Sequence, residues 1–125
     1  MPDVETLDVQ TAVTRYIETF NETDGDRRRE LIEALYTPDC TYTDPSVDLK
    51  GAEQIDRFIE QTQERFPGFT FTLGGAIDAH HNQARFQWHG GPADAPDEYV
   101  GFDVIVTDDG RIRNVYGFMD AAPSP

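Results

Sequence analysis

The segment EYVGFDVIVT, residues 98–107, decides the fold class of this chain. Its β-branched and aromatic residues favour a strand, in which alternate side chains point to opposite faces of a sheet. Both faces of this strand are largely apolar, with Val100, Phe102, Val104 and Val106 on one and Tyr99, Gly101, Asp103 and Ile105 on the other. We therefore expect a long strand that is covered on both faces.

The second apolar face has a consequence for assembly. An antiparallel sheet that carries helices on one face normally exposes a polar second face. Because both faces of residues 98–107 are apolar, the outer face also needs a cover, and a second copy of the chain is the simplest one. The sequence thus predicts a homodimer formed through the outer face of the sheet.

Upstream of this strand the pattern is helical. Apolar residues recur at helical spacing from Val9 to Phe20, which predicts an amphipathic helix over about 6–22. A second, short helix is expected after Asp26, its predicted N-cap. A third helix follows Gly51 and ends before the pair Pro67-Gly68.

The remaining segments alternate with period two. Besides residues 98–107, we expect strands at Cys40–Thr43, at 69–73 with a bulge at Gly74-Gly75, at 84–89 and at 111–119. Helices followed by an antiparallel meander are typical of the α+β class. We therefore predict a single domain over 1–125, with a core of about 8–120.

Composition excludes several classes of partner. The net charge is −14, so nucleic acid and anionic membrane surfaces are not expected to bind. No apolar run approaches the roughly 20 residues that span a bilayer, and the first residues do not resemble a signal peptide. The single cysteine, Cys40, cannot form an internal disulfide. These features predict a cytoplasmic protein.

The kinds of charged residue are also skewed. Aspartate outnumbers glutamate by fifteen to nine, and arginine outnumbers lysine by nine to one. Repulsion among so many carboxylates destabilises a compact chain in dilute salt, and at about 1 M salt the screening length falls to roughly 3 Å. We therefore hypothesise a halophilic protein from a salt-rich cytoplasm. An ordinary acidic protein is the alternative.

Motifs along the chain resemble a known family. The closing stretches are the most specific: Gly101-Phe102-Asp103-Val104, Asp109-Gly110-Arg111-Ile112 and Gly117-Phe118-Met119-Asp120. With Asp44-Pro45 ending a strand and Gly51 opening a helix, they resemble the nuclear-transport-factor-2-like superfamily, in its SnoaL-like polyketide cyclase and ketosteroid isomerase-related branch. The resemblance covers about 8–120. It implies a cone-shaped, curved antiparallel sheet closed by three N-terminal helices, a cystatin-like roll.

The same resemblance implies a catalytic set. Tyr16, Asp44 and Asp103 match positions at which ketosteroid isomerases carry a hydrogen-bonding tyrosine, a general base and a protonated aspartic acid. The resemblance to SnoaL-like cyclases implies a different site, built on a strand aspartate as the acid–base group with a histidine nearby. Asp103 matches that aspartate. His89 is the candidate partner, but it and Trp88 point to opposite faces, and only one of them can face the pocket.

The residues themselves support part of this set. Asp103 interrupts an apolar strand, and burial of a carboxyl group raises its pKa. If Asp44 faces the same pocket, the two carboxylates repel each other and the pair retains a proton. The alternatives are a core tyrosine at Tyr16, an Asx turn at Asp44 and a purely structural hydrogen bond at Asp103.

Aromatic residues define the expected ligand. Phe58, Phe86, Trp88, Tyr116 and Phe118 are predicted to line the pocket, which suits a small apolar organic molecule. Neither a cofactor nor a metal ion is expected. The resemblance implies a cofactor-free isomerase or cyclase that acts next to a carbonyl by aspartate acid–base chemistry, and a non-catalytic dimeric ligand-binding module is the alternative.

Overall fold

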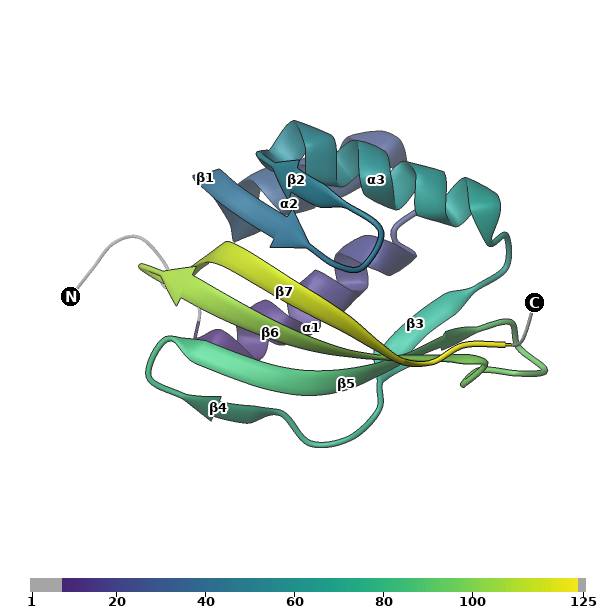
Figure 1. The fold of residues 1–125 in the computed structure, drawn as a ribbon. Coiled ribbons are helices and arrows are strands. Elements are labelled where there is room, and N and C mark those ends of the chain that lie inside the picture. The colour runs from purple at the N-terminus through teal and green to yellow at the C-terminus, as the bar shows by residue number, and fades with distance from the viewer. Residues whose placement is uncertain (1–7, 124–125) are drawn as a thin grey trace.

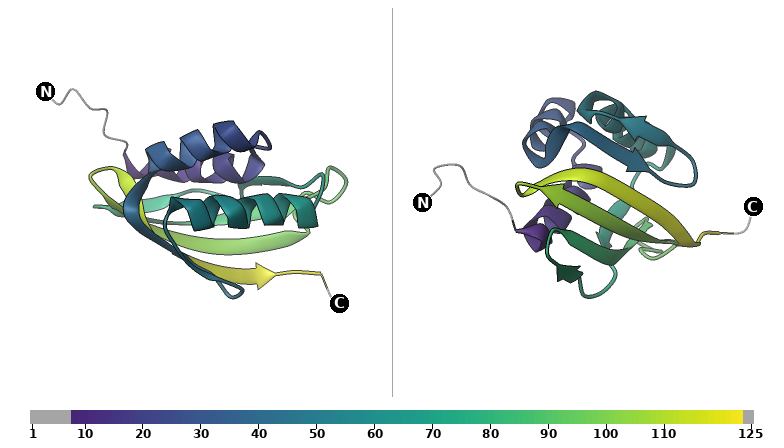
Figure 2. Two further views of the ribbon diagram at one scale, coloured as in Figure 1. Left: turned by 90° about the horizontal axis from the view of Figure 1, so that it is seen from above. Right: turned by 60° about the vertical axis from the view of Figure 1, so that its left-hand side comes forward.

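The computed structural model describes residues 8–123, in which three helices pack on a curved, open sheet of seven strands (Figure 1). Helix α1 (Val9–Asn21) lies across the sheet and contacts β3 and β5. Helices α2 (Gly25–Leu35) and α3 (Ala52–Arg65) pack against each other and against β1, and Figure 2 shows them above the sheet. The α+β fold with three N-terminal helices is confirmed.

The helix starts follow from their capping residues. Asp8 precedes α1 and accepts a hydrogen bond from the backbone N–H of Thr11 at 2.7 Å. The predicted cap of α2 was wrong: Asp24, not Asp26, accepts the N–H groups of Asp26 and Arg27. The chain is already extended at Asp24, so Asp26 falls within the first turn, where its charge complements the helix dipole. The predicted positions 6 and 7 of α1 lie outside the described residues.

The sheet is mixed, which corrects the predicted antiparallel meander. Its strands are β1 (Tyr36–Thr43), β2 (Asp48–Lys50), β3 (Thr70–Leu73), β4 (Asp78–His80), β5 (Gln83–Gly91), β6 (Tyr99–Asp108) and β7 (Arg111–Ala121). They are ordered β2-β1-β7-β6-β5-β3, with β4 also paired to β5. The β1–β7 pair is parallel and the other pairs are antiparallel. Because helix α3 and five strands intervene, the last strand can return beside the first in the same direction.

Several strand boundaries also differ from the prediction. Strand β1 starts directly after α2 and passes through Pro38, where its register against β7 shifts. An irregularity of this kind tolerates a residue that lacks a backbone N–H. Gly74-Gly75 is not a bulge within one strand but separates β3 from β4, and β5 extends to Gly91. Register shifts between β6 and β7 add to the curvature of the sheet.

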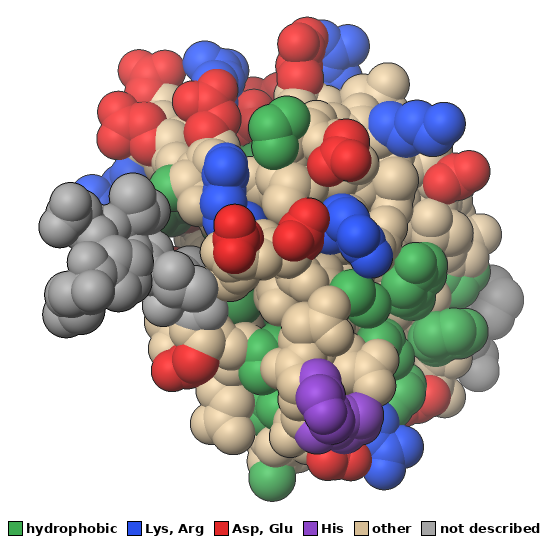
Figure 3. Space-filling model, turned by 90° about the vertical axis from the view of Figure 1, so that its left-hand side faces the viewer, with side chains coloured by type: hydrophobic (Ala, Val, Ile, Leu, Met, Phe, Trp, Pro, Cys, Tyr) green, Lys and Arg blue, Asp and Glu red, His purple; other side chains and the backbone are tan. Residues whose placement is uncertain are grey.

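The two faces of β6 behave as the alternation predicted. Gly101, Asp103 and Ile105 are buried under the helices, within a core that includes Val13, Ile59 and other apolar residues. On the outer face Val104 pairs with Tyr116, and Phe102 with Phe118. Tyr116 and Phe118 are exposed in the single chain. Figure 3 shows hydrophobic side chains gathered along the right-hand margin of that view, apart from the charged groups above.

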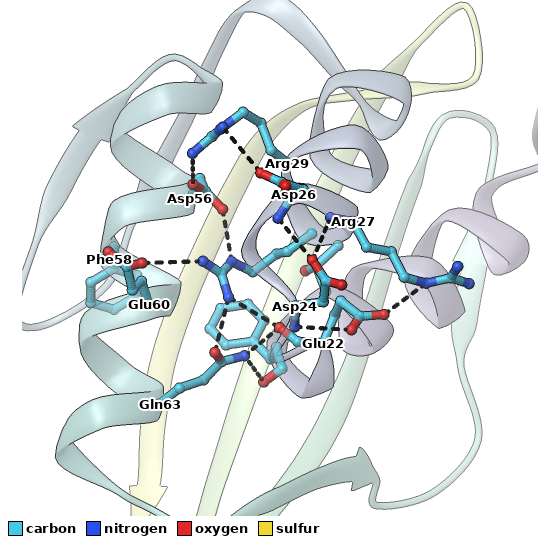
Figure 4. A network of polar contacts seen from close by, with 12 residues as sticks. Glu22, Asp24, Asp26, Arg27, Arg29, Asp56, Phe58, Glu60 and Gln63 are labelled. Atoms are coloured by element: carbon cyan, nitrogen blue, oxygen red, sulfur yellow. Dashed lines mark hydrogen bonds and ion pairs between the residues drawn. The ribbon is translucent and has the colours of Figure 1, made fainter.

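A buried arginine joins the three helices (Figure 4). The Arg28 side chain is 2% exposed, and its Nε donates to Asp56 Oδ1 of α3 at 2.7 Å. Its Nη1 donates to the carbonyl of Glu22, just beyond α1, and to Gln63 Oε1. Gln63 in turn donates to the carbonyls of Phe20 and Glu22. This network fixes the end of α1 against α3, where both helices border the cavity described below.

Two further properties bear on partners. Between residues 8 and 123, no helix combines the length and apolar character needed to cross a membrane. Over the same range, no three His, Cys, Asp or Glu side chains are grouped so that they could hold a metal ion.

Candidate active site in the concave face of the sheet

A cavity of about 470 Å³ lies between the concave face of the sheet and the helices. Its wall is mainly aromatic and comes from every layer of the fold: Tyr16 and Phe20 of α1, Tyr42 of β1, Phe58 and Phe66 of α3, Phe69 and Phe71 around the start of β3, Trp88 of β5 and Tyr99 of β6. Asp44 and Asp103 also line it. Such a mixture of apolar surface and a few polar groups suits a small organic ligand.

Asp103 is the most buried carboxyl group of the cavity. Its residue is 3% exposed. The Tyr16 hydroxyl donates to its Oδ2 at 2.6 Å, and the indole N–H of Trp88 donates to its Oδ1 at 3.2 Å. Helix α1 and strand β5 therefore hold the Asp103 carboxyl group from two sides, which leaves it little freedom to turn.

The surroundings of Asp103 keep it partly protonated. Burial is the main cause that raises its pKa, from an ordinary 3.8 to about 6, and the nearby Asp44 adds to the rise. The hydrogen bonds from Tyr16 and Trp88 act in the opposite direction because they stabilise the ionised form. Burial and the Asp103 charge also raise the pKa of Tyr16 well above its usual value, so its hydroxyl remains a proton donor.

Asp44 is held in a different way. It lies in the turn between β1 and β2, and its Oδ1 accepts hydrogen bonds from the N–H and hydroxyl of Ser46 and from the N–H of Val47. Its Oδ2 accepts the Tyr42 hydroxyl at 2.8 Å. The Asx turn considered as an alternative is therefore present, and the same carboxylate also lines the cavity.

A glycine of β7 lets the two carboxyl groups approach each other. A Cβ atom at Gly117 would lie 3.0 Å from Asp103 Oδ1 and 3.1 Å from the Cβ of Asp44. Both side chains thus flank the same point of the strand, and any larger residue there would push them apart. The predicted trio of Tyr16, Asp44 and Asp103 is accordingly brought to one cavity wall.

The predicted lining residues divide into two groups. Phe58 and Trp88 line the cavity. Phe86 does not: it is buried in the core and packs edge-on against Tyr16, with ring centroids 5.8 Å apart. Tyr116 and Phe118 also do not, because their parity on β7 places them on the outer face, where Phe118 is 56% exposed. The next residue, Met119, pairs with Gly101, so the ordinary alternation of the strand places it on the cavity side.

The choice between Trp88 and His89 is settled by the pairing of β5. Trp88 pairs with Gly101 of β6, and its indole lies against the space where a side chain at Gly101 would be. His89 points to the other face and contacts Gln87. No histidine therefore stands beside Asp103, and the hydrogen-bonding partners of that carboxyl group are a tyrosine and a tryptophan.

Four contributors were not identified from the sequence. Tyr42 and Ser46 bind Asp44, Gly117 makes room for both carboxyl groups, and Arg65 borders the cavity. Tyr42 and Ser46 each lie two residues from Asp44, so they were the nearest available signals. Gly117 and Arg65 depend on contacts between distant segments.

Comparison with known proteins agrees with this fold. A search of curated proteins found no match. Among solved structures, a proposed isomerase of the SnoaL-like family from Agrobacterium tumefaciens is 36% identical to this chain, with a TM-score of 0.86. The match covers 90% of this chain and 97% of that one. A proposed ketosteroid isomerase from Kribbella flavida is 24% identical, with a TM-score of 0.70, over 94% and 81%.

A proposed SnoaL-like polyketide cyclase from Jannaschia shares the fold at 18% identity, with a TM-score of 0.69, over 96% of this chain and 92% of that one. The description of the SnoaL-like domain matches residues 13–115, a range that contains Tyr16, Asp44 and Asp103 and ends within β7. The chain therefore belongs to the SnoaL-like domain family.

Proposed function

We propose that the protein is a cofactor-free isomerase or cyclase that acts on a small apolar ketone at the carbon next to the carbonyl. The observation that carries this proposal is the pairing of two unlike carboxyl groups on one cavity wall. Asp103 is buried with a pKa of about 6, whereas Asp44 is partly exposed and accepts several hydrogen bonds. Groups with such different surroundings can serve as acid and base at one pH.

In the proposed reaction Asp44 acts as the base. Its carboxylate takes the proton from the carbon next to the carbonyl, and the electron pair of that C–H bond moves to the carbonyl oxygen as an enolate. The Tyr16 hydroxyl donates a hydrogen bond to this oxygen, in a site from which the ligand excludes water. When Asp103 is protonated it can donate to the Tyr16 oxygen, which frees the Tyr16 proton for the ligand.

The two outcomes differ only in where the electron pair goes next. In an isomerase, the conjugated enolate takes the proton back from Asp44 at a more distant carbon, and the double bond moves. In a cyclase, the enolate carbon attacks a second carbonyl carbon of the same molecule, and a carbon–carbon bond forms. The π electrons of that second carbonyl move to its oxygen, which takes the proton back from Asp44. Neither outcome consumes an oxidant, a reductant or a cofactor.

Proton abstraction can be tested without the natural substrate. We would measure deuterium uptake from D₂O at the carbons next to the carbonyl of 2-tetralone, a bicyclic ketone small enough for the cavity. Asp44→Asn should lower the enzymatic exchange rate by about 10²–10⁴-fold because it removes the base. Asp48→Asn is the matched control, since Asp48 is exposed and binds Thr43 on the neighbouring strand. Exchange that survives intact in Asp44→Asn would refute this role.

One observation favours a second function, a non-catalytic ligand-binding module. Hydrogen bonds from Tyr42, Ser46 and Val47 occupy both oxygens of Asp44, which leaves fewer lone pairs of the carboxylate directed at a ligand. In that case the cavity would bind an apolar molecule and return it unchanged. Ligand binding seen by calorimetry, without any exchange above the buffer rate across a panel of ketones, would support this function.

We also propose that the protein is a homodimer through the outer face of its sheet. Phe102 and Val104 pair there with Phe118 and Tyr116, and the latter two are exposed in the single chain. Phe118→Asp would place a charge in the centre of this face, so light scattering at high salt should report a dimer for the natural chain and a monomer for the variant. A natural chain that is monomeric over the micromolar range would refute the proposal.

A further inference from the structure

Among residues 8–123, Arg65 is the one cationic side chain that lines the cavity, and the proposed chemistry does not use it. It lies in the last turn of α3, and its guanidinium carbon is 5.5 Å from the centroid of the Phe66 ring. Stacking on an aromatic ring orients an arginine without occupying its hydrogen-bond donors. The guanidinium is therefore positioned at the cavity with its donors available.

Arg65 also differs from other arginines of the helical layer. Arg57, two turns earlier on α3, is 3.9 Å from Glu53, and Arg28 binds Asp56. Within residues 8–123, no carboxylate lies within ion-pair distance of Arg65. An arginine without an acidic partner is notable in a chain whose net charge is −14.

The aromatic cluster beside Arg65 marks one end of the cavity. Phe66, Phe69 and Tyr99 contact one another, with ring centroids 5.0 to 5.6 Å apart. Tyr99 begins β6 and Asp103 lies four residues further along that strand, which separates their Cα atoms by roughly 13 Å. The carboxyl groups and the arginine are thus near different ends of one apolar space.

This arrangement fits a ligand with two different ends. A molecule about 10 Å long could place a carbonyl at Tyr16 and Asp103, an aromatic or alicyclic body against the phenylalanines, and an anion at Arg65. A carboxylate is the group whose geometry the planar guanidinium matches best. Without Arg65, the surrounding acidic side chains would disfavour an anionic ligand.

We propose that Arg65 is a specificity-determining residue that binds the carboxylate of an apolar keto acid, and that such acids are the substrate class. What happens at the carbonyl end of this ligand rests on the proposed function. Binding of the carboxylate end of the ligand depends on Arg65 alone. The alternative role of Arg65 is structural, because a cation in the last turn of a helix stabilises the helix dipole.

The test compares two probes that differ in charge. 2-Naphthylacetate carries the carboxylate, and 2-naphthylacetamide has the same body with a neutral end. Calorimetry measures both dissociation constants. The indole N–H signal of Trp88, the only tryptophan of the chain, reports in ¹H–¹⁵N NMR spectra whether each probe enters the cavity. Neither measurement requires turnover.

The variant is Arg65→Met, which keeps an apolar stem over Phe66 and removes the charge. Arg57→Met is the matched control, since it makes the same change of net charge on the same helix but lies outside this cavity. We expect the natural protein to prefer the carboxylate. Arg65→Met should weaken carboxylate binding about five- to tenfold and leave amide binding unchanged, while Arg57→Met changes neither.

Three results would overturn the inference. The first is equal affinity of the natural protein for both probes. The second is an equal loss of affinity for both probes in Arg65→Met. The third is an equal loss of affinity for the carboxylate probe in both arginine variants. These results leave the acid–base proposal intact, because that proposal fails on deuterium exchange instead. If neither probe binds or perturbs Trp88, the cavity does not accept apolar acids and the inference also fails.

Discussion

Replacing Asp103 by asparagine should make the protein more stable at neutral pH, although it removes a residue of the proposed active site. Asparagine has the shape of the protonated acid. Its carbonyl oxygen can accept the Trp88 N–H, and its amide can donate to the Tyr16 oxygen. The substitution therefore keeps both contacts of the buried side chain and removes the ionisation.

The magnitude follows from the pKa of Asp103, which is about 6 in the folded protein against 3.8 ordinarily. Between these two values the folded state holds a proton that the unfolded state has released. The free energy of unfolding therefore decreases as the pH rises through this range. A difference of about 2 pKa units corresponds to about 3 kcal/mol, which the natural protein loses by pH 7 and the Asp103→Asn variant does not.

Urea unfolding followed by circular dichroism, at several pH values from 3.5 to 7.5 and at constant salt, measures this effect. The variant should gain stability over the natural protein as the pH rises from 4 to 6, and the gain should level off near pH 7. Asp108→Asn, at the exposed end of the same strand, is the control, and its difference from the natural protein should not change over this range. A constant difference for Asp103→Asn would show that the pKa of Asp103 is not raised in the folded protein.

Three more changes test the remaining contacts. Gly101→Ala would place a methyl group in the indole ring of Trp88, so the Trp88 N–H signal should shift and enzymatic exchange should fall. Gly75→Ala meets no atom within 4 Å and should alter neither. Arg28→Met should lower the free energy of unfolding by about 3–5 kcal/mol in urea titrations, because it leaves the buried Asp56 with only the longer contact to the exposed Arg29. A second change of Asp56→Leu should recover part of the loss. If the acidic composition reflects a salt-rich environment, the melting temperature should rise with KCl up to about 1 M, whereas a midpoint independent of KCl would contradict the halophilic hypothesis.

Local pattern was sufficient for much of the fold. Helical spacing located the three helices, and alternation in residues 98–107 placed Asp103 and Phe102 on opposite faces of β6, as the structure has them. That the Asp103 face is the inner one was implied by the family resemblance. These features depend on neighbours within a few residues of each other. The same local alternation failed for Tyr116 and Phe118, because the sequence does not tell which of two apolar faces meets the helices.

The composition, the helices, the alternation of each strand and the presence of a carboxyl group inside an apolar strand are properties of the sequence alone. Only the tertiary structure decided that β1 lies parallel beside β7, that Gly117 admits both Asp44 and Asp103, and that Arg65 borders the same cavity. The physical reason is that a side chain's direction depends on its own strand or helix, whereas a site depends on the register between segments that are far apart in the chain.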